Sequence, residues 1–178
     1  MTNNDRRLSK AEYSTKVSVT QLQQHPKLMQ QYGALMTAAL KELSRVGWVA
    51  EALAQEGKYA FAPWCAMTAP EGVMGALLPG ADDGRDLVCH RLFVEHESWI
   101  RTLVHELRHL WQRTVRHLDL LDESVEYCDR PTEVDARAQE DLVDKLIDQE
   151  TLQRLNAEAK ALDDALWDAV LGLDDDDI

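Results

Sequence analysis

Hydrophobic residues in the first third of the chain recur at steps of three and four, which is the spacing of one face of an α-helix. The repeating positions between residues 26 and 55 are Leu28, Met29, Tyr32, Leu35, Met36, Ala39, Leu40 and Leu43. This pattern predicts an amphipathic helix over 26–55. Gly47 marks a point at which the helix can break into two, because glycine weakens a helix interior.

Between residues 58 and 94 the pattern changes to short apolar runs separated by Gly, Pro and Asp. Runs of this length, bounded by turn residues, are typical of β-strands. We expect two or three strands, the strongest of them over 87–94. The run Ala81-Asp82-Asp83-Gly84 predicts the turn of a hairpin.

The second half of the chain returns to helical spacing. We expect Glu97 or Ser98 to open a helix that runs to about His117, with Ser98 as the candidate N-cap. One apolar stripe follows this helix: Ile100, Leu103, Val104, Leu107, Trp111 and Leu118. Pro131 favours the start of another helix, over 132–150, and a last helix is expected over 151–171. The pattern predicts a mostly helical α+β fold with a small sheet before the helix at 98.

Length and composition place the chain among globular proteins of about one domain. We divide it into a flexible arm (1–18), a main domain (19–150) and an acidic C-terminal helix and tail (151–178). The polar N-terminus lacks a secretory signal and no long apolar run is present, so we expect a cytoplasmic protein outside the membrane. Three widely spaced cysteines, Cys65, Cys89 and Cys128, are expected to be thiols.

The net charge of −13 is concentrated in the last third of the chain. Residues 1–118 carry 14 Lys and Arg against 12 Asp and Glu, whereas residues 119–178 carry 5 against 20. Such an acidic region argues against direct nucleic-acid binding. We expect it to form a solvated surface or to contact a protein partner.

The helix expected from residue 98 contains His105-Glu106-x-x-His109, an H-E-x-x-H motif. Histidines four residues apart lie about 40° apart around a helix, so both imidazoles can reach one Zn²⁺ at about 2.0–2.1 Å. They face away from the apolar stripe, as expected if the stripe anchors the helix while the histidines line a cleft. Glu106 is the candidate general base, placed to take a proton from a zinc-bound water.

A catalytic zinc usually has three protein ligands and one open position. His117 lies about 18 Å from His105 along a continuous helix, which is too far. Glu133 stands in the first turn of the next predicted helix and can face the histidines across a helical hairpin. Because Asp135 is about 200° from Glu133 around that helix, we assign Glu133 as the third ligand. Asp135 is expected to support a ligand or to bond the first turn.

These residues resemble the zincin metallopeptidases, in particular the gluzincin-like group, in which a glutamate on a later helix follows H-E-x-x-H. Residues 133–136 are similar to the E-x-x-A glutamate helix of small ImmA/IrrE-type and related bacterial or phage peptidase domains. The resemblance covers about residues 87–140. Arg108 and Arg137 differ from it, since relatives usually have an uncharged residue at the first position and often Asp or Asn at the second.

The resemblance implies a zinc-dependent enzyme that hydrolyses peptide bonds of a protein substrate. His105, His109 and Glu133 would hold the zinc, and Glu106 would activate the bound water. Tyr127 would stabilise the oxyanion of the tetrahedral intermediate, with a packed hairpin tyrosine as the alternative.

The resemblance also implies that the strand over 87–94 is an edge strand that holds a peptide in extended form, with an ordinary core strand as the alternative. Two other classes of function stay open. The acidic last third could bind a basic partner or mimic nucleic-acid charge beside a purely structural zinc. The motif could also have arisen by chance in a helical protein that binds no metal.

Overall fold

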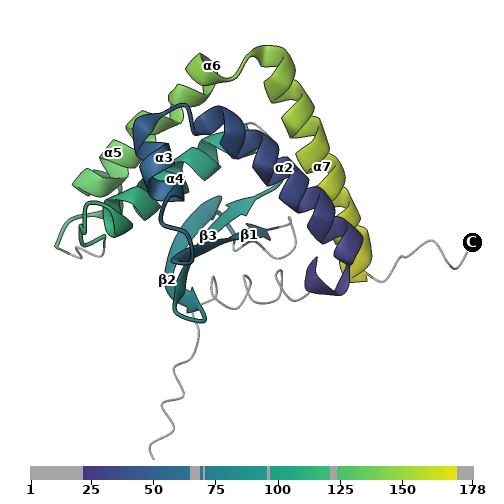
Figure 1. Cartoon of the computed structure of the whole chain (residues 1–178), viewed down its shortest axis with the longest axis horizontal. Coiled ribbons are helices and arrows are strands. Elements are labelled where there is room, and N and C mark those ends of the chain that lie inside the picture. Colours follow the sequence, from purple (N-terminus) through teal and green to yellow (C-terminus); the bar gives the residue numbers. More distant parts are fainter. Residues whose placement is uncertain (1–21, 65–68, 70, 96, 121–123, 172–178) are drawn as a thin grey trace, which may run out of the picture.

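The computed structural model describes residues 22–64, 69, 71–95, 97–120 and 124–171. Helices pack over a small three-stranded sheet (Figure 1). The α+β class expected from the sequence is therefore confirmed. The predicted arm (1–18) and the acidic run at 174–177 lie outside the described residues.

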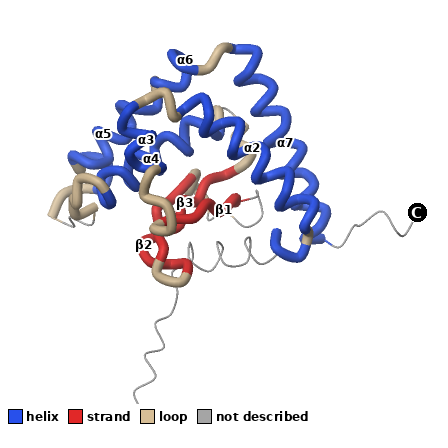
Figure 2. The backbone as a smooth tube through the Cα atoms, in the orientation of Figure 1, coloured by secondary structure: helices blue, strands red, loops and turns tan. Residues whose placement is uncertain are grey.

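Among the described residues, α2 and α3 precede the sheet and the other helices follow it, so the strands occupy one short stretch of the chain (Figure 2). In chain order the elements are α2 (Pro26–Leu43), α3 (Gly47–Leu53), β1 (Tyr59–Trp64), β2 (Gly75–Asp82), β3 (Arg85–Arg91), α4 (Trp99–Thr114), the 3₁₀ helix η1 (Tyr127–Asp129), α5 (Pro131–Glu140), α6 (Leu142–Leu146) and α7 (Gln149–Leu171).

β3 is the central strand of the sheet, which has the order β1-β3-β2. β1 pairs parallel to β3, and β2 pairs antiparallel to it. Every side chain from Asp86 to His90 is buried, a continuous run typical of a strand covered on both faces. The expectation of an edge strand over 87–94 is therefore wrong, and the core-strand alternative is confirmed. Among the described strands β2 is an edge, which suits Pro79 because proline has no N–H to donate.

Asp83 and Gly84 form the turn between β2 and β3, within the run predicted for it. Their φ angles are 50° and 87°, the left-handed conformation that a two-residue hairpin turn requires and that Asp and Gly adopt at low cost. The hairpin closed by this turn places Gly75 opposite His90 at its far end.

The predicted helix over 26–55 is divided into α2 and α3, as Gly47 indicated. Pro26 lies in the first turn of α2, where its missing N–H is not needed. The N–H of Ser44 bonds to the Leu40 carbonyl and ends α2, and α3 begins at Gly47 itself.

α4 begins where the sequence predicted, because the Ser98 hydroxyl accepts a hydrogen bond of 3.3 Å from the Ile100 N–H. The helix ends at Thr114, earlier than expected. His117 and Leu118 lie beyond its end and are exposed, so Leu118 does not belong to the apolar stripe. α4 contacts β3 and β2 as well as α5, so it lies between the sheet and α5 (Figure 1).

The predicted helix over 132–150 is divided at Asp141 into α5 and α6. α7 then runs back along α2 (Figure 1). Leu155 and Ala159 of α7 share one buried cluster with Leu35 and Met36 of α2. The predicted boundary at residue 151 thus falls in the first turn of a helix that contributes to the main core.

Within the described ranges, no helix combines the length and the apolar character needed to cross a membrane. Cys89 is buried and Cys128 is exposed, and neither forms a disulfide in the described part of the chain. Both thiols agree with the expectation from the sequence, and Cys65 lies outside the described residues.

Candidate metal centre

α4 and α5 bring three potential metal ligands to one point. His105 and His109 lie one turn apart on α4, and Glu133 lies in the first turn of α5, which packs against α4. One donor atom from each residue lies within 4.8 Å of the other two. The structure thus brings together the three ligands that the sequence predicted.

Distances within this cluster resemble the edges of a zinc coordination tetrahedron. The two Nε2 atoms are 3.0 Å apart, and each lies 3.2 Å from a different carboxylate oxygen of Glu133. Ligands at 2.0–2.1 Å from a tetrahedral Zn²⁺ are about 3.3 Å from one another. Small adjustments of the side chains would therefore fit the cluster to the ion.

The Nδ1 atom of each imidazole, which points away from the cluster, is hydrogen-bonded to an acceptor. Nδ1 of His105 lies 2.8 Å from Glu140 Oε1, and Nδ1 of His109 lies 2.9 Å from Gln112 Oε1. Because both partners are acceptors, each Nδ1 carries a proton, and a neutral ring directs its Nε2 lone pair into the cluster. Metal-binding histidines use this tautomer and usually have such an outer partner.

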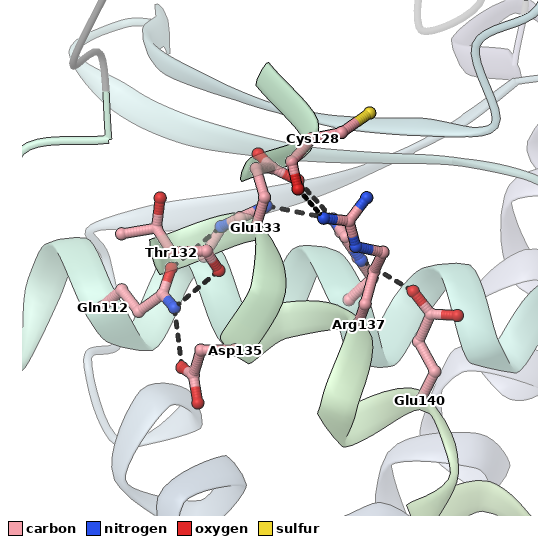
Figure 3. Close-up of polar contacts among 9 residues, drawn as sticks. Gln112, Cys128, Thr132, Glu133, Asp135, Arg137 and Glu140 are labelled. Atoms are coloured by element: carbon pink, nitrogen blue, oxygen red, sulfur yellow. Dashed lines mark hydrogen bonds and ion pairs between the residues drawn. The ribbon is translucent and has the colours of Figure 1, made fainter. Parts of the chain in front are cut away.

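The amide of Gln112 has only one orientation compatible with its neighbours. Its nitrogen donates to the Thr132 carbonyl at 3.0 Å and to Asp135 Oδ2 at 2.8 Å (Figure 3). Its oxygen must therefore face His109. Asp135 contacts Gln112 rather than the three donor atoms, so it supports a ligand, which is one of the two positions expected for it.

Arg108, one of the two residues that differ from the zincin pattern, holds Asp135 in place. Two of its nitrogens lie 2.7 and 3.1 Å from the Asp135 oxygens. The guanidinium also stacks over Trp111 and Trp48, 4.0 and 4.9 Å from the ring centroids. Burial raises the pKa of Asp135, but hydrogen bonds from Arg108 and Gln112 lower it more, so this carboxylate stays ionised.

Glu106 is buried beside the histidines, with 5% of its surface exposed. Burial is the main cause that raises the pKa of Glu106 to about 7, because a charged carboxylate loses hydration there. A carboxylate with a pKa near 7 can both accept and return a proton at neutral pH. Its environment therefore suits the general-base role expected from the motif.

The three potential ligands also shift one another's pKa values. Burial lowers the pKa of His105, but hydrogen bonds to Glu133 and Glu140 outweigh it and raise the pKa to about 10. The same balance raises the pKa of His109. Burial raises the pKa of Glu133, but hydrogen bonds to both histidines hold it well below its usual range. The cluster therefore attracts positive charge, which a divalent metal would supply in place of the protons.

Tyr127 lies at the rim of the cluster. Its side chain is 57% exposed, so the alternative of a packed hairpin tyrosine is wrong. Partial burial of the hydroxyl, followed by the charge of Glu133 and a hydrogen bond to it, raises the pKa of Tyr127. The tyrosine thus stays protonated and donates to Glu133, and its oxyanion role stays a prediction.

A cleft of about 370 Å³ opens over the cluster. Its walls come from α4, α5, η1, the start of β2 and the segments that precede β2 and α4. The lining residues are Gly72, Val73, Met74, Gly75, Glu97, Thr102, His105, Glu106, Tyr127, Glu133, Arg137 and Glu140. The strand that lines the cleft is therefore β2 and not the 87–94 segment predicted for this position.

Sequence reasoning missed two residues that hold the ligands, Gln112 and Glu140. Gln112 follows His109 by three residues on one helix, so helical spacing could have identified it. Glu140 lies seven residues after Glu133 and therefore on the same face of α5. His117 lies outside the cluster, on the exposed chain beyond α4, in agreement with its exclusion by distance.

No family model matches the chain, and neither a curated protein nor a solved structure matches it.

Proposed function

We propose that the protein is a zinc-dependent peptidase in which His105, His109 and Glu133 hold the metal. The observation that carries this proposal is the convergence of three donor atoms beside a buried glutamate, Glu106. Zinc at this position would act as a Lewis acid on water and on the peptide carbonyl.

Different residues in and beside the cleft would carry out different parts of the hydrolysis. Glu106 takes the proton of the attacking water and returns it to the leaving amine nitrogen. Glu140 and Gln112 keep both imidazoles in the tautomer that binds metal. Tyr127 stands at the rim, where its hydroxyl can donate to the developing oxyanion.

The number of ligands favours a catalytic over a structural zinc. Structural zinc sites are usually closed by four protein ligands, whereas catalytic sites have three and an open position. The group formed by the described residues has three members and borders a cleft. Both features support an enzyme rather than an acidic interaction protein stabilised by zinc.

Replacement of Glu106 by Gln tests the proposal, because it removes the base and leaves the ligands in place. We expect Glu106→Gln to retain one zinc per chain and to cleave a mixture of peptides at least about 100-fold more slowly than the wild type. Mass spectrometry of the peptides and metal analysis of the protein give the two measurements. Glu158→Gln, on the exposed face of α7, is the matched control.

Two results would contradict the proposal. One is zinc-loaded Glu106→Gln that cleaves as fast as the wild type. The other is zinc-loaded wild-type protein that leaves a broad peptide mixture intact. The cytoplasmic location, and a protein partner for the acidic C-terminal region, stay predictions from the sequence.

A further inference from the structure

Among the described residues that line the cleft over the metal centre, Arg137 is the only Lys or Arg. It follows Glu133 by four residues on α5, so both side chains lie on the same helix face. It is also the second residue that differs from the zincin pattern, and the proposed chemistry gives it no role.

The guanidinium of Arg137 has an unusual set of neighbours. One terminal nitrogen donates to the Cys128 carbonyl (Figure 3). Four carboxylates, from Glu97, Glu106, Glu133 and Glu140, line the same cleft, yet within the described chain none of them forms an ion pair with Arg137.

Several other arginines of the described chain are paired with carboxylates. Arg101 and Arg108 bond to Asp144 and Asp135, and exposed Arg154 pairs with Glu158. Arg130 and Arg137 each donate to a backbone carbonyl instead, and of these two only Arg137 lines the cleft. Its contact with the Cys128 carbonyl leaves its charge and its remaining donors at the cleft.

We propose that Arg137 binds a carboxylate group of the substrate close to the scissile peptide bond. This inference rests on the proposed peptidase function and adds a substrate class to it. A guanidinium presents a planar fork of donors that matches a carboxylate. Outside the metal centre, the other charged side chains that line the cleft are acidic, so a substrate carboxylate away from the metal is favoured only beside this residue.

Two sources supply such a carboxylate, namely the C-terminus of a peptide and the side chain of Asp or Glu. Peptide hydroxamates can separate them, since the hydroxamate group chelates zinc and the peptide part lies in the cleft. Four matched ligands end in Ala with a free carboxylate, Ala-amide, Glu-amide or Gln-amide. Calorimetry would measure their Kd for the zinc-loaded full-length wild type, Arg137→Gln and the control Arg154→Gln.

In the wild type we expect at least one carboxylate ligand to bind about 10-fold or more tightly than its neutral counterpart. Preference for the free Ala carboxylate would identify the C-terminus, and preference for Glu-amide would identify an acidic side chain. Arg137→Gln should lose the preference while its zinc content and its Kd for the neutral ligands stay within about twofold, and Arg154→Gln should keep it. The preference should also weaken as salt is raised.

Equal binding of charged and neutral ligands by the wild type would overturn the role of Arg137 alone. A preference that survives in Arg137→Gln would overturn it equally. Failure of the wild type to hold zinc, or to bind any hydroxamate, would overturn the proposed function and this inference together. The two failures are therefore distinguishable.

Discussion

Gln112 bonds three groups at once, which are His109 Nδ1, the Thr132 carbonyl and the Asp135 carboxylate. Because its nitrogen donates to the last two, its oxygen is left to accept the imidazole proton. Arg108 holds Asp135 and so completes a chain of contacts that ends at His109. The orientation of one ligand thus depends on residues that would not touch the metal.

Replacement of Gln112 by Met should therefore weaken zinc binding. Methionine has a similar length but neither accepts well nor donates, so His109 loses its outer partner. We expect zinc affinity to fall about 10- to 100-fold, measured by competition with a chelator. Gln139→Met is the matched control, because Gln139 is a partly buried glutamine of α5 that accepts a hydrogen bond from Trp48 instead. Equal affinity in wild type and Gln112→Met would refute this role.

His90 is a second buried histidine and does not belong to the candidate metal centre. It accepts or donates a 3.0 Å hydrogen bond with Tyr32 and stacks on Trp99. Burial lowers the pKa of His90 to about 4, although the Arg91 carbonyl opposes the shift. The unfolded chain therefore binds this proton more readily than the folded chain between about pH 4 and 6.5, and stability falls as the pH is lowered through that window.

Because His90 takes up a proton more readily in the unfolded chain, we expect the free energy of unfolding to fall by about 3 kcal/mol on its account between pH 7 and pH 4. Urea unfolding of the wild type and of His90→Gln at several pH values would measure it. Since all other groups titrate in both proteins, the difference between the two pH profiles isolates His90. Parallel profiles would show that its pKa is not lowered in the folded state.

Residue spacing was enough to predict His105, Glu106 and His109, since they lie within one turn of a single helix. Glu133 was predictable because a proline and a chain reversal place it at the start of the following helix. Glu140 was not, because its contact with His105 depends on how α5 crosses α4. That crossing is set by packing and not by either helix alone.

At Gly75, β2 passes close to α4. A Cβ at this position would lie 2.7 Å from Thr102 Cγ2, 2.8 Å from Glu106 Oε1 and 2.9 Å from the Cys89 carbonyl. The last of these atoms is backbone of the paired strand and cannot easily move. Glycine is therefore required for β2 to pass beside the H-E-x-x-H helix.

Gly75→Ala should destabilise the fold by about 1–3 kcal/mol and displace Glu106. Gly33→Ala serves as the control, since Gly33 is exposed in the middle of α2 and a Cβ there meets nothing within 4 Å. Alanine at that position should stabilise the fold by about 0.5–1 kcal/mol. Chemical denaturation would measure both values, and destabilisation of similar size in the two variants would disprove the close approach.

Local signals predicted the elements better than their arrangement. The Ser98 cap, the proline of α5 and the Asp83-Gly84 turn each act within a few residues, so the sequence contains them directly. β3 was expected at an edge, whereas pairing with β1 across a long connection makes it central. Such pairing depends on distant segments, which is why the pattern of one strand could not indicate it.

At the scale of the whole molecule, one core links the N-terminal and C-terminal helices. α7 buries Leu155 and Leu162 against α2, while its exposed face carries ion pairs such as Lys160 with Asp164. The concentration of acidic residues in the last third thus coexists with a structural role for that region. α4 lies between the sheet and α5. Because α4 and α5 pack together, His105 and His109 on α4 face the third potential ligand, Glu133, on α5.

The most direct test of the zinc peptidase account is a crystal structure of the zinc-loaded protein with anomalous data at the zinc edge. We predict one zinc bound by Nε2 of His105 and His109 and by a carboxylate oxygen of Glu133, each at about 2.0–2.2 Å, with no fourth protein ligand. Zinc bound elsewhere, or a fourth side chain that closes the site, would contradict the account.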